Sequence, residues 1–117
     1  MSTRILIIDD EQDLCHLLKI ILLKDKFLID CAYSLTDAGQ KLLLQPQIIF
    51  LDNNLPDGTG LDFLKQNPHA FRKSCVTMIS ADARPEIKKD ALQEGIRVFL
   101  QKPFAVGAIR SAIQSIP

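Results

Sequence analysis

The chain has 117 residues, of which 47% are hydrophobic and 24% are charged, and its 14 basic and 14 acidic side chains cancel. This length suits one domain with a single core, and a neutral chain has no general attraction to nucleic acid or anionic lipid. The sequence contains neither the roughly 20 apolar residues of a membrane helix nor a signal peptide, so we expect a cytoplasmic domain that contacts neither membrane nor nucleic acid directly.

Short apolar segments rich in β-branched residues recur along the chain, and helical patterns separate them. Runs of this length and composition predict strands that are apolar on both faces. We expect strands at Arg4–Asp9, Phe27–Ala32, Gln47–Asp52, Cys75–Ser80 and Arg97–Gln101.

Helical spacing or capping residues mark the intervals between these strands. Ser34 followed by Asp37 resembles a capping box, and Thr59 can cap a third helix. Pro85 suits the first turn of a fourth helix, which Gly95 ends. The first and last helices are predicted from apolar residues three or four positions apart, which we expect to face the core. These residues are Leu14, Leu17, Leu18, Ile21, Leu22, Val106, Ile109, Ile113 and Ile116.

This alternation of strand and helix predicts one α/β domain that spans residues 1–117. Strands that are apolar on both faces argue for a parallel sheet with helices on both sides. Right-handed crossovers favour a doubly wound (βα)5 sandwich with the flavodoxin-like strand order 2-1-3-4-5. In such a sheet, ligands bind beyond the carboxyl ends of the strands.

The cysteines and histidines carry no signal of a catalytic or metal site. Cys15, Cys31 and Cys75 lack short metal-type spacings, and we expect them to be reduced thiols in or near the core. His16 and His69 stand alone in polar or loop contexts, so we expect them at the surface.

Polar side chains follow four of the expected strands at their carboxyl ends. The first strand ends in Asp9 and Asp10, and the third ends in Asp52. The fourth ends in Ser80, and the fifth runs into Lys102. Adjacent carboxylates repel one another, and Mg²⁺, or Mn²⁺ in its place, would relieve that repulsion because it prefers oxygen ligands. The sequence therefore predicts a metal site at the three aspartates.

The same residue types suit phosphoryl transfer. Asp52, at the end of a central strand, could act as a nucleophile. Lys102 would neutralise one phosphoryl oxygen, and Ser80 could hydrogen-bond another. Simpler roles are also open, because Asp10 could cap the first helix from a solvated turn and Ser80 could cap the segment after its strand. The predicted position of all these residues at one edge of the sheet favours a phosphoryl-transfer site over these simpler roles.

Four segments, ILIIDDE, IIFLDNNLPDGTGLDFL, VTMISAD and VFLQKPF, resemble the receiver domain of two-component response regulators, over essentially the whole chain. The resemblance implies that Asp52 accepts a phosphoryl group in a Mg²⁺-dependent reaction. It also implies that Asp9, Asp10, Asp52 and the backbone carbonyl of Asn54 form the metal site.

The resemblance further implies a mechanism of output. Lys102 matches the lysine of the family's site, and its bond to Pro103 would be cis. Ser80 matches a switch hydroxyl that moves toward the phosphoryl group, and Phe99 matches an aromatic residue that then turns inward. The surface of the fourth helix, fifth strand and fifth helix would change in response.

The partners implied by the family are a sensor histidine kinase or a histidine phosphotransfer protein as the phosphoryl donor. A C-terminal output domain beyond this chain, or a separate protein, would receive the signal. The domain would act as a monomer or as a phosphorylation-dependent homodimer. We expect a signalling module that catalyses its own phosphorylation and dephosphorylation, and no other enzyme activity.

Two alternatives stay open at this point. A pseudo-receiver would keep the fold and bind a partner without using phosphate. A phosphatase resembling the haloacid dehalogenase family would place Asp-x-Asp on the first strand, whereas this chain has Asp9-Asp10-Glu11 there. A P-loop nucleotide site is excluded because the sequence lacks its motif.

Overall fold

The computed structural model describes residues 3–23 and 25–114. Its main sheet contains five parallel strands in the order β2-β1-β3-β6-β7, which is the predicted order 2-1-3-4-5. The strands are β1 (Arg4–Ile8), β2 (Leu28–Ala32), β3 (Ile48–Asp52), β6 (Cys75–Ser80) and β7 (Val98–Gln101). Each predicted strand is therefore confirmed to within one residue at either end.

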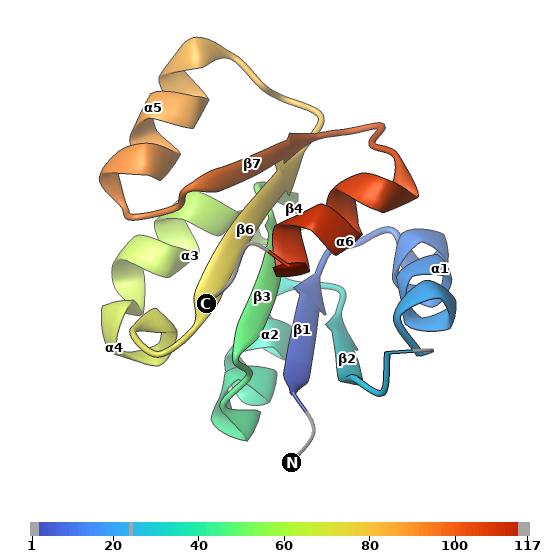
Figure 1. Ribbon diagram of the computed structural model, residues 1–117. Coiled ribbons are helices and arrows are strands. Elements are labelled where there is room, and N and C mark those ends of the chain that lie inside the picture. Colours follow the sequence, from blue (N-terminus) through green and yellow to red (C-terminus); the bar gives the residue numbers. More distant parts are fainter. Residues whose placement is uncertain (1–2, 24, 115–117) are drawn as a thin grey trace.

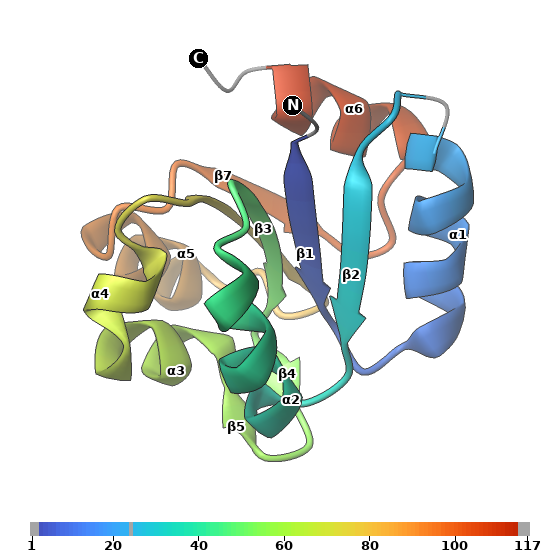
Figure 2. The ribbon, with the colours of Figure 1, turned by 90° about the horizontal axis from the view of Figure 1, so that it is seen from below.

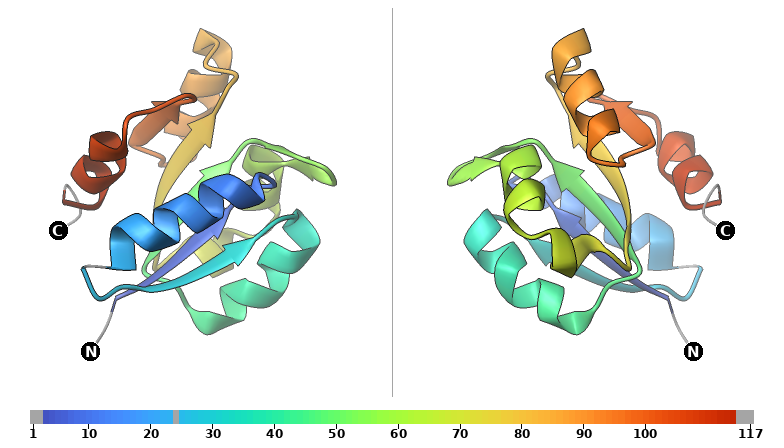
Figure 3. Two further views of the ribbon diagram at one scale, coloured as in Figure 1. Left: turned by 90° about the vertical axis from the view of Figure 1, so that its right-hand side faces the viewer. Right: turned by 90° about the vertical axis from the view of Figure 1, so that its left-hand side faces the viewer.

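Helices cover both faces of this sheet, as predicted (Figures 1 and 2). On one face lie α1 (Gln12–Leu23) and α6 (Val106–Gln114), and on the other lie α2 (Leu35–Lys41), α3 (Gly60–Gln66) and α5 (Pro85–Gln93). The same layers are visible edge-on in Figure 3. None of the helices in the described ranges has the length and apolar character needed to cross a bilayer.

The pleat of the strands divides the core into two clusters. In β1, Ile5 and Ile7 pack with α1 and α6, whereas Leu6 and Ile8 pack with the helices of the other face. The inner strands are buried on both sides because alternate side chains point to opposite faces. Neighbouring residues at a strand end therefore face different helical layers.

The predicted capping residues begin and end their helices as expected. The Ser34 hydroxyl accepts a hydrogen bond from the Asp37 N–H at 3.1 Å, and the Thr59 hydroxyl accepts one from Asp62 at 3.2 Å. Pro85 opens α5, and Gly95 follows its end with a φ of 89°. A positive φ of this size favours glycine because it has no Cβ.

Four expectations about the core need comment. Val106 is 43% exposed, because it is the first residue of α6 and lies at the edge of the packed face. The prediction for Leu17 was wrong, because α1 buries Cys15, Leu18 and Leu22 and leaves Leu17 48% exposed. Cys75 is exposed rather than in the core, since it is the first residue of its strand. Ile116 lies outside the described residues.

The segment after β3 contains elements that the sequence analysis did not predict. The short strands β4 (Asn54–Leu55) and β5 (Gly58–Thr59) pair as an antiparallel hairpin before α3, and α4 (Pro68–Phe71) follows that helix. Before β3, a 3-10 turn, η1 (Leu42–Leu44), continues α2 as far as the second predicted helix extends. Elements of two to four residues carry no periodicity that a sequence pattern could reveal.

Candidate functional site

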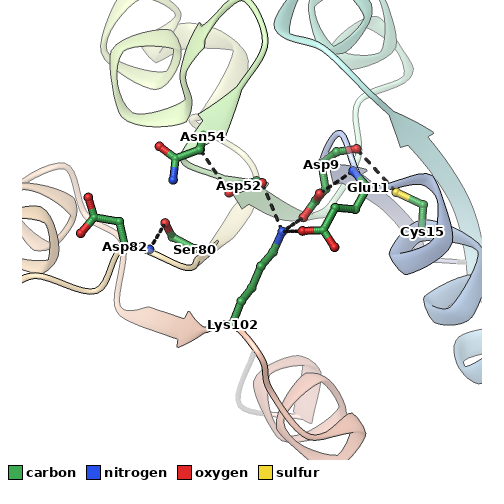
Figure 4. Close-up of polar contacts among 8 residues, drawn as sticks. All are labelled: Asp9, Glu11, Cys15, Asp52, Asn54, Ser80, Asp82 and Lys102. Carbon is green, nitrogen blue, oxygen red and sulfur yellow. Dashed lines mark hydrogen bonds and ion pairs between the residues drawn. The ribbon is translucent and has the colours of Figure 1, made fainter.

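Lys102 lies at the centre of a carboxylate cluster beyond the carboxyl ends of the strands (Figure 4). Its Nζ lies 2.7 Å from Asp9 Oδ2, 2.9 Å from Glu11 Oε1 and 3.3 Å from Asp52 Oδ2. Burial alone would lower the pKa of Lys102, but the bonds to Asp9 and Glu11 outweigh it and hold that pKa above its usual range. The Lys102–Pro103 bond is cis, as expected.

Asp9 is fully buried immediately after β1. Its N–H donates to the Ala32 carbonyl at 2.9 Å, and its Oδ1 accepts from the Glu11 N–H at 2.9 Å. Its Oδ2 forms an ion pair with Lys102 Nζ at 2.7 Å. Burial raises the pKa of Asp9, and the Lys102 ammonium offsets part of that increase.

Asp52 is the last residue of β3 and is only 3% exposed. Its Oδ1 accepts a hydrogen bond from the Asn54 N–H at 3.1 Å, and its Oδ2 faces Lys102. Burial raises the pKa of Asp52 to about 6, and the Asp9 charge adds to this effect while Asn54 and Lys102 oppose it. Asp52 is therefore mostly ionised at neutral pH, at a cost in folding free energy.

The structure brings the three predicted metal ligands together. Asp9, Asp10 and Asp52 each present a carboxylate oxygen within 4.8 Å of the others, and Asp10 is exposed to solvent. These three carboxylate oxygens lie close enough together to fit a small divalent cation. Asn54 lies beside the cluster because its N–H binds Asp52.

Ser80 occupies the other side of the site, at the end of β6, and is fully buried. Its Oγ accepts a hydrogen bond from the Asp82 N–H at 3.0 Å, so the simpler capping geometry considered for this residue is present. The bond uses the hydroxyl as an acceptor and leaves its proton for donation to another group. Phe99 lies on the neighbouring strand β7 and is half-buried against α5.

Asn53 and Gly60 position the loop that follows Asp52 through contacts that the sequence did not reveal. Asn53 is 4% exposed, and its Oδ1 accepts from the Leu61 N–H at 3.0 Å, which joins the loop to the start of α3. Gly60 packs so closely that a Cβ there would lie 2.4 Å from the Asp52 carbonyl oxygen. The only sequence signal was a glycine at the first position of a predicted helix.

Asp57, in the turn of the β4–β5 hairpin, connects the hairpin to α2 through hydrogen bonds. Its Oδ1 accepts from the Leu35 N–H at 2.8 Å, and its Oδ2 accepts from the Thr36 N–H and hydroxyl, both at 3.0 Å. The bonds from Leu35 and Thr36 hold the pKa of Asp57 below its ordinary value. The carboxylate therefore caps a helix that is distant in sequence.

Replacing Asp57 with alanine is expected to lower the melting temperature by a few degrees at pH 7 and to speed amide exchange at Leu35 and Thr36. Because the folded-state pKa of Asp57 is depressed, its stabilisation is present above the unfolded pKa and is lost as the pH falls through the folded value. The difference from the unaltered chain should therefore shrink toward pH 3. Asp62→Ala is the control, and equal exchange at Leu35 in both variants would contradict the assignment.

The family of the chain follows from its relatives together with this geometry. A family model described as the response regulator receiver domain matches residues 5–114. The chain belongs to this family. It is a receiver domain of two-component response regulators, which are signalling modules.

The receiver domain is similar to curated proteins of very different lengths. It is 32% identical over 117 residues to the transcriptional regulatory protein KdpE of Staphylococcus aureus, covering 99% of this chain and 50% of that protein. It is 30% identical over 115 residues to the chemotaxis protein CheY of Bacillus subtilis, covering 97% of this chain and 96% of that protein. The receiver domain spans about half or less of the length of the first curated relatives it matches.

Solved structures have the same fold. The signal receiver domain of a LuxO repressor protein from Vibrio parahaemolyticus superposes with a TM-score of 0.90 at 25% identity, covering 97% of this chain and 88% of that one. A CheX–CheY–BeF3–Mg²⁺ complex from Borrelia burgdorferi superposes with a TM-score of 0.87 at 26% identity, covering 97% and 88%. The predicted flavodoxin-like fold class is thereby confirmed.

Proposed function

We propose that the receiver domain accepts a phosphoryl group on Asp52 and signals through a change in its surface. The observation that carries this proposal is the position of the Lys102 ammonium, which bonds Asp9 and Asp52 at once within the buried acidic cluster. A carboxylate at the end of a central strand, beside a fixed cation and further oxygen ligands, suits in-line phosphoryl transfer.

The reaction forms one bond and breaks another. An ionised oxygen of Asp52 attacks the phosphorus atom of a phosphohistidine, and the bond from phosphorus to the imidazole nitrogen breaks. The electron pair stays on the imidazole, which then takes up a proton. Lys102 neutralises negative charge on a phosphoryl oxygen, and Ser80 donates its hydroxyl proton to another.

Asp9, Asp10, Asp52 and the backbone carbonyl of Asn54 would hold Mg²⁺, or Mn²⁺ in its place. When bound, the metal supplies positive charge that offsets the negative charge of the phosphoryl oxygens. Asp9 is supported in this role because its buried carboxylate lies within 4.8 Å of the oxygens of Asp10 and Asp52. Asp10 is supported because it adds an exposed oxygen within reach of the other two carboxylates.

The output is proposed to arise from Ser80 and Phe99. Movement of Ser80 toward the phosphoryl group would favour an inward position of the Phe99 ring, and the surface of α5, β7 and α6 would change. Such a change is a shift between two populated states, driven by contacts that differ between them.

The donor would be a sensor histidine kinase or a histidine phosphotransfer protein. The recipient would be either an output domain joined to the receiver domain or a separate partner protein. Relatives of both lengths exist, because the match covers 50% of KdpE of S. aureus but 96% of CheY of B. subtilis. The receiver domain would act in the cytoplasm, as a monomer or as a homodimer that forms on phosphorylation. It would catalyse only its own phosphorylation and dephosphorylation.

Intact-mass spectrometry after incubation with acetyl phosphate tests this proposal directly. We expect a gain of one phosphoryl group in the presence of Mg²⁺, little gain with EDTA, and none in Asp52→Asn. The matched control is Asp62→Asn, which should gain mass like the unaltered chain. Persistent labelling of Asp52→Asn would show that another residue is the acceptor.

Absence of labelling under all conditions would instead favour a pseudo-receiver that binds a partner without phosphate. Titration with Mg²⁺ separates the two cases further. Asp10→Ala should weaken Mg²⁺ binding if the acidic cluster holds the metal, and an unchanged affinity would place the metal elsewhere.

A further inference from the structure

The half-buried ring of Phe99 is covered by a charged side chain from α5. Lys88 Nζ lies 5.7 Å from the centroid of this ring, within the range of a cation–π contact. Lys88 is exposed, and α5 packs over β7, the strand that carries Phe99 (Figure 1). The contact therefore joins a helix of the proposed output surface to the residue proposed to move within it.

The register of β6 and β7 relates this ring to the phosphorylation site. Ser80 pairs with Gln101, and Met78 pairs with Phe99. Ser80 and Met78 are two residues apart in one strand, so their side chains point to the same face, as does Phe99, which packs in the same cluster as Met78. Ser80 and Phe99 are consequently diagonal neighbours on the α5 side of the sheet.

We propose that Lys88 is a positioning residue whose charge holds the Phe99 ring toward α5 and thereby sets how readily the receiver domain switches. This inference rests on the proposed function, because it assumes that an inward ring accompanies phosphorylation. The ammonium faces the ring in its present half-buried position, and a contact made in only one state stabilises that state alone. Loss of the Lys88 charge therefore raises the population of the inward ring and, by linkage, tightens binding of a phosphoryl analogue at Asp52.

The role of the Lys88 charge is tested by comparing Lys88→Gln, which removes it, with Lys88→Arg, which keeps it. The measured quantity is the affinity for beryllofluoride, a phosphoryl analogue, in the presence of Mg²⁺. A cation–π contact at an exposed site predicts that Lys88→Gln binds beryllofluoride about two- to five-fold more tightly. Lys88→Arg retains a cation over the ring and should bind like the unaltered chain. Lys89→Gln removes the adjacent charge on the same helix and should also leave the affinity unchanged.

Two further measurements separate this role from a general effect of charge. In a Phe99→Leu background, Lys88→Gln should no longer alter the affinity, since the ring that the ammonium faces is gone. In the unphosphorylated domain, NMR scalar couplings of Phe99 should show a larger inward rotamer population in Lys88→Gln than in Lys89→Gln. Equal affinity of these two variants, or an effect that persists in Phe99→Leu, would overturn the proposal.

Failure of the proposed function has a different signature. If beryllofluoride does not bind any variant, the acceptor chemistry at Asp52 is wrong. The Phe99 rotamer populations still test Lys88 in that case, and populations that are the same in Lys88→Gln and Lys89→Gln would refute its positioning role independently.

Discussion

Replacing Asp52 with asparagine is expected to stabilise the folded receiver domain at pH 8 when EDTA removes divalent metal. The pKa of Asp52 rises from 3.8 to about 6 on folding, so the ionised carboxylate weakens the fold. A shift of this size corresponds to on the order of 2–3 kcal/mol at a pH above both values. Asparagine removes the charge but can still accept the hydrogen bond from Asn54, and Lys102 keeps its contacts with Asp9 and Glu11.

The sign of the pH dependence distinguishes this explanation from others. A carboxyl group whose folded-state pKa is raised costs stability fully above that pKa and costs nothing below the unfolded value. The advantage of Asp52→Asn should therefore be largest above pH 6 and small at pH 4. Urea unfolding of both proteins from pH 4 to pH 8 measures it, and a gain that does not change with pH would contradict the electrostatic origin.

Replacing Gly60 with alanine is expected to destabilise the receiver domain and to disturb the site. The added Cβ would lie 2.4 Å from the Asp52 carbonyl oxygen and 2.9 Å from Leu51 Cγ, closer than such atoms can approach. Because the Asp52 carbonyl oxygen is a backbone atom, the clash can be relieved only if β3 or the start of α3 moves. Overpacking of this kind costs on the order of 3 kcal/mol, and the displaced Asp52 should react more slowly with acetyl phosphate.

Gly39→Ala is the matched control for this substitution. Gly39 lies in α2, and its added Cβ would meet nothing within 4 Å. Alanine there should stabilise the chain by about 0.5–1 kcal/mol because it favours the helix. Thermal unfolding of both variants gives the comparison, and a Gly60→Ala protein as stable as Gly39→Ala would refute the close packing at Asp52.

The sheet, its strand order and the meeting of the site residues were predictable because each has a regular or local signal. Apolar runs predict the strands, crossover handedness limits their order, and parallel strands bring their carboxyl ends to one edge. The sequence alone therefore predicts that Asp9, Asp10, Asp52 and Lys102 lie together.

The features that escaped prediction depend on contacts between distant segments. Leu17 fits the apolar spacing of α1 as well as Leu18 does, and only the packing of α1 on the sheet decides which is buried. The bond from Asp57 to α2 spans residues that no local pattern connects. The need for glycine at Gly60 comes from an atom of the preceding strand, which is visible only in three dimensions.

The pleat of the sheet assigns acceptor and switch to opposite sides. Asp52 is two residues after Phe50 in β3 and shares its face, on which Phe50 packs with α1 and α6. Ser80 is two residues after Met78 in β6 and shares the opposite face, on which Met78 packs with α5 and its neighbours. The core side chains behind the acceptor therefore belong to a different cluster from those behind the switch residue. After a duplication of this fold, the packing behind Asp52 and the packing behind Ser80 could therefore diverge separately.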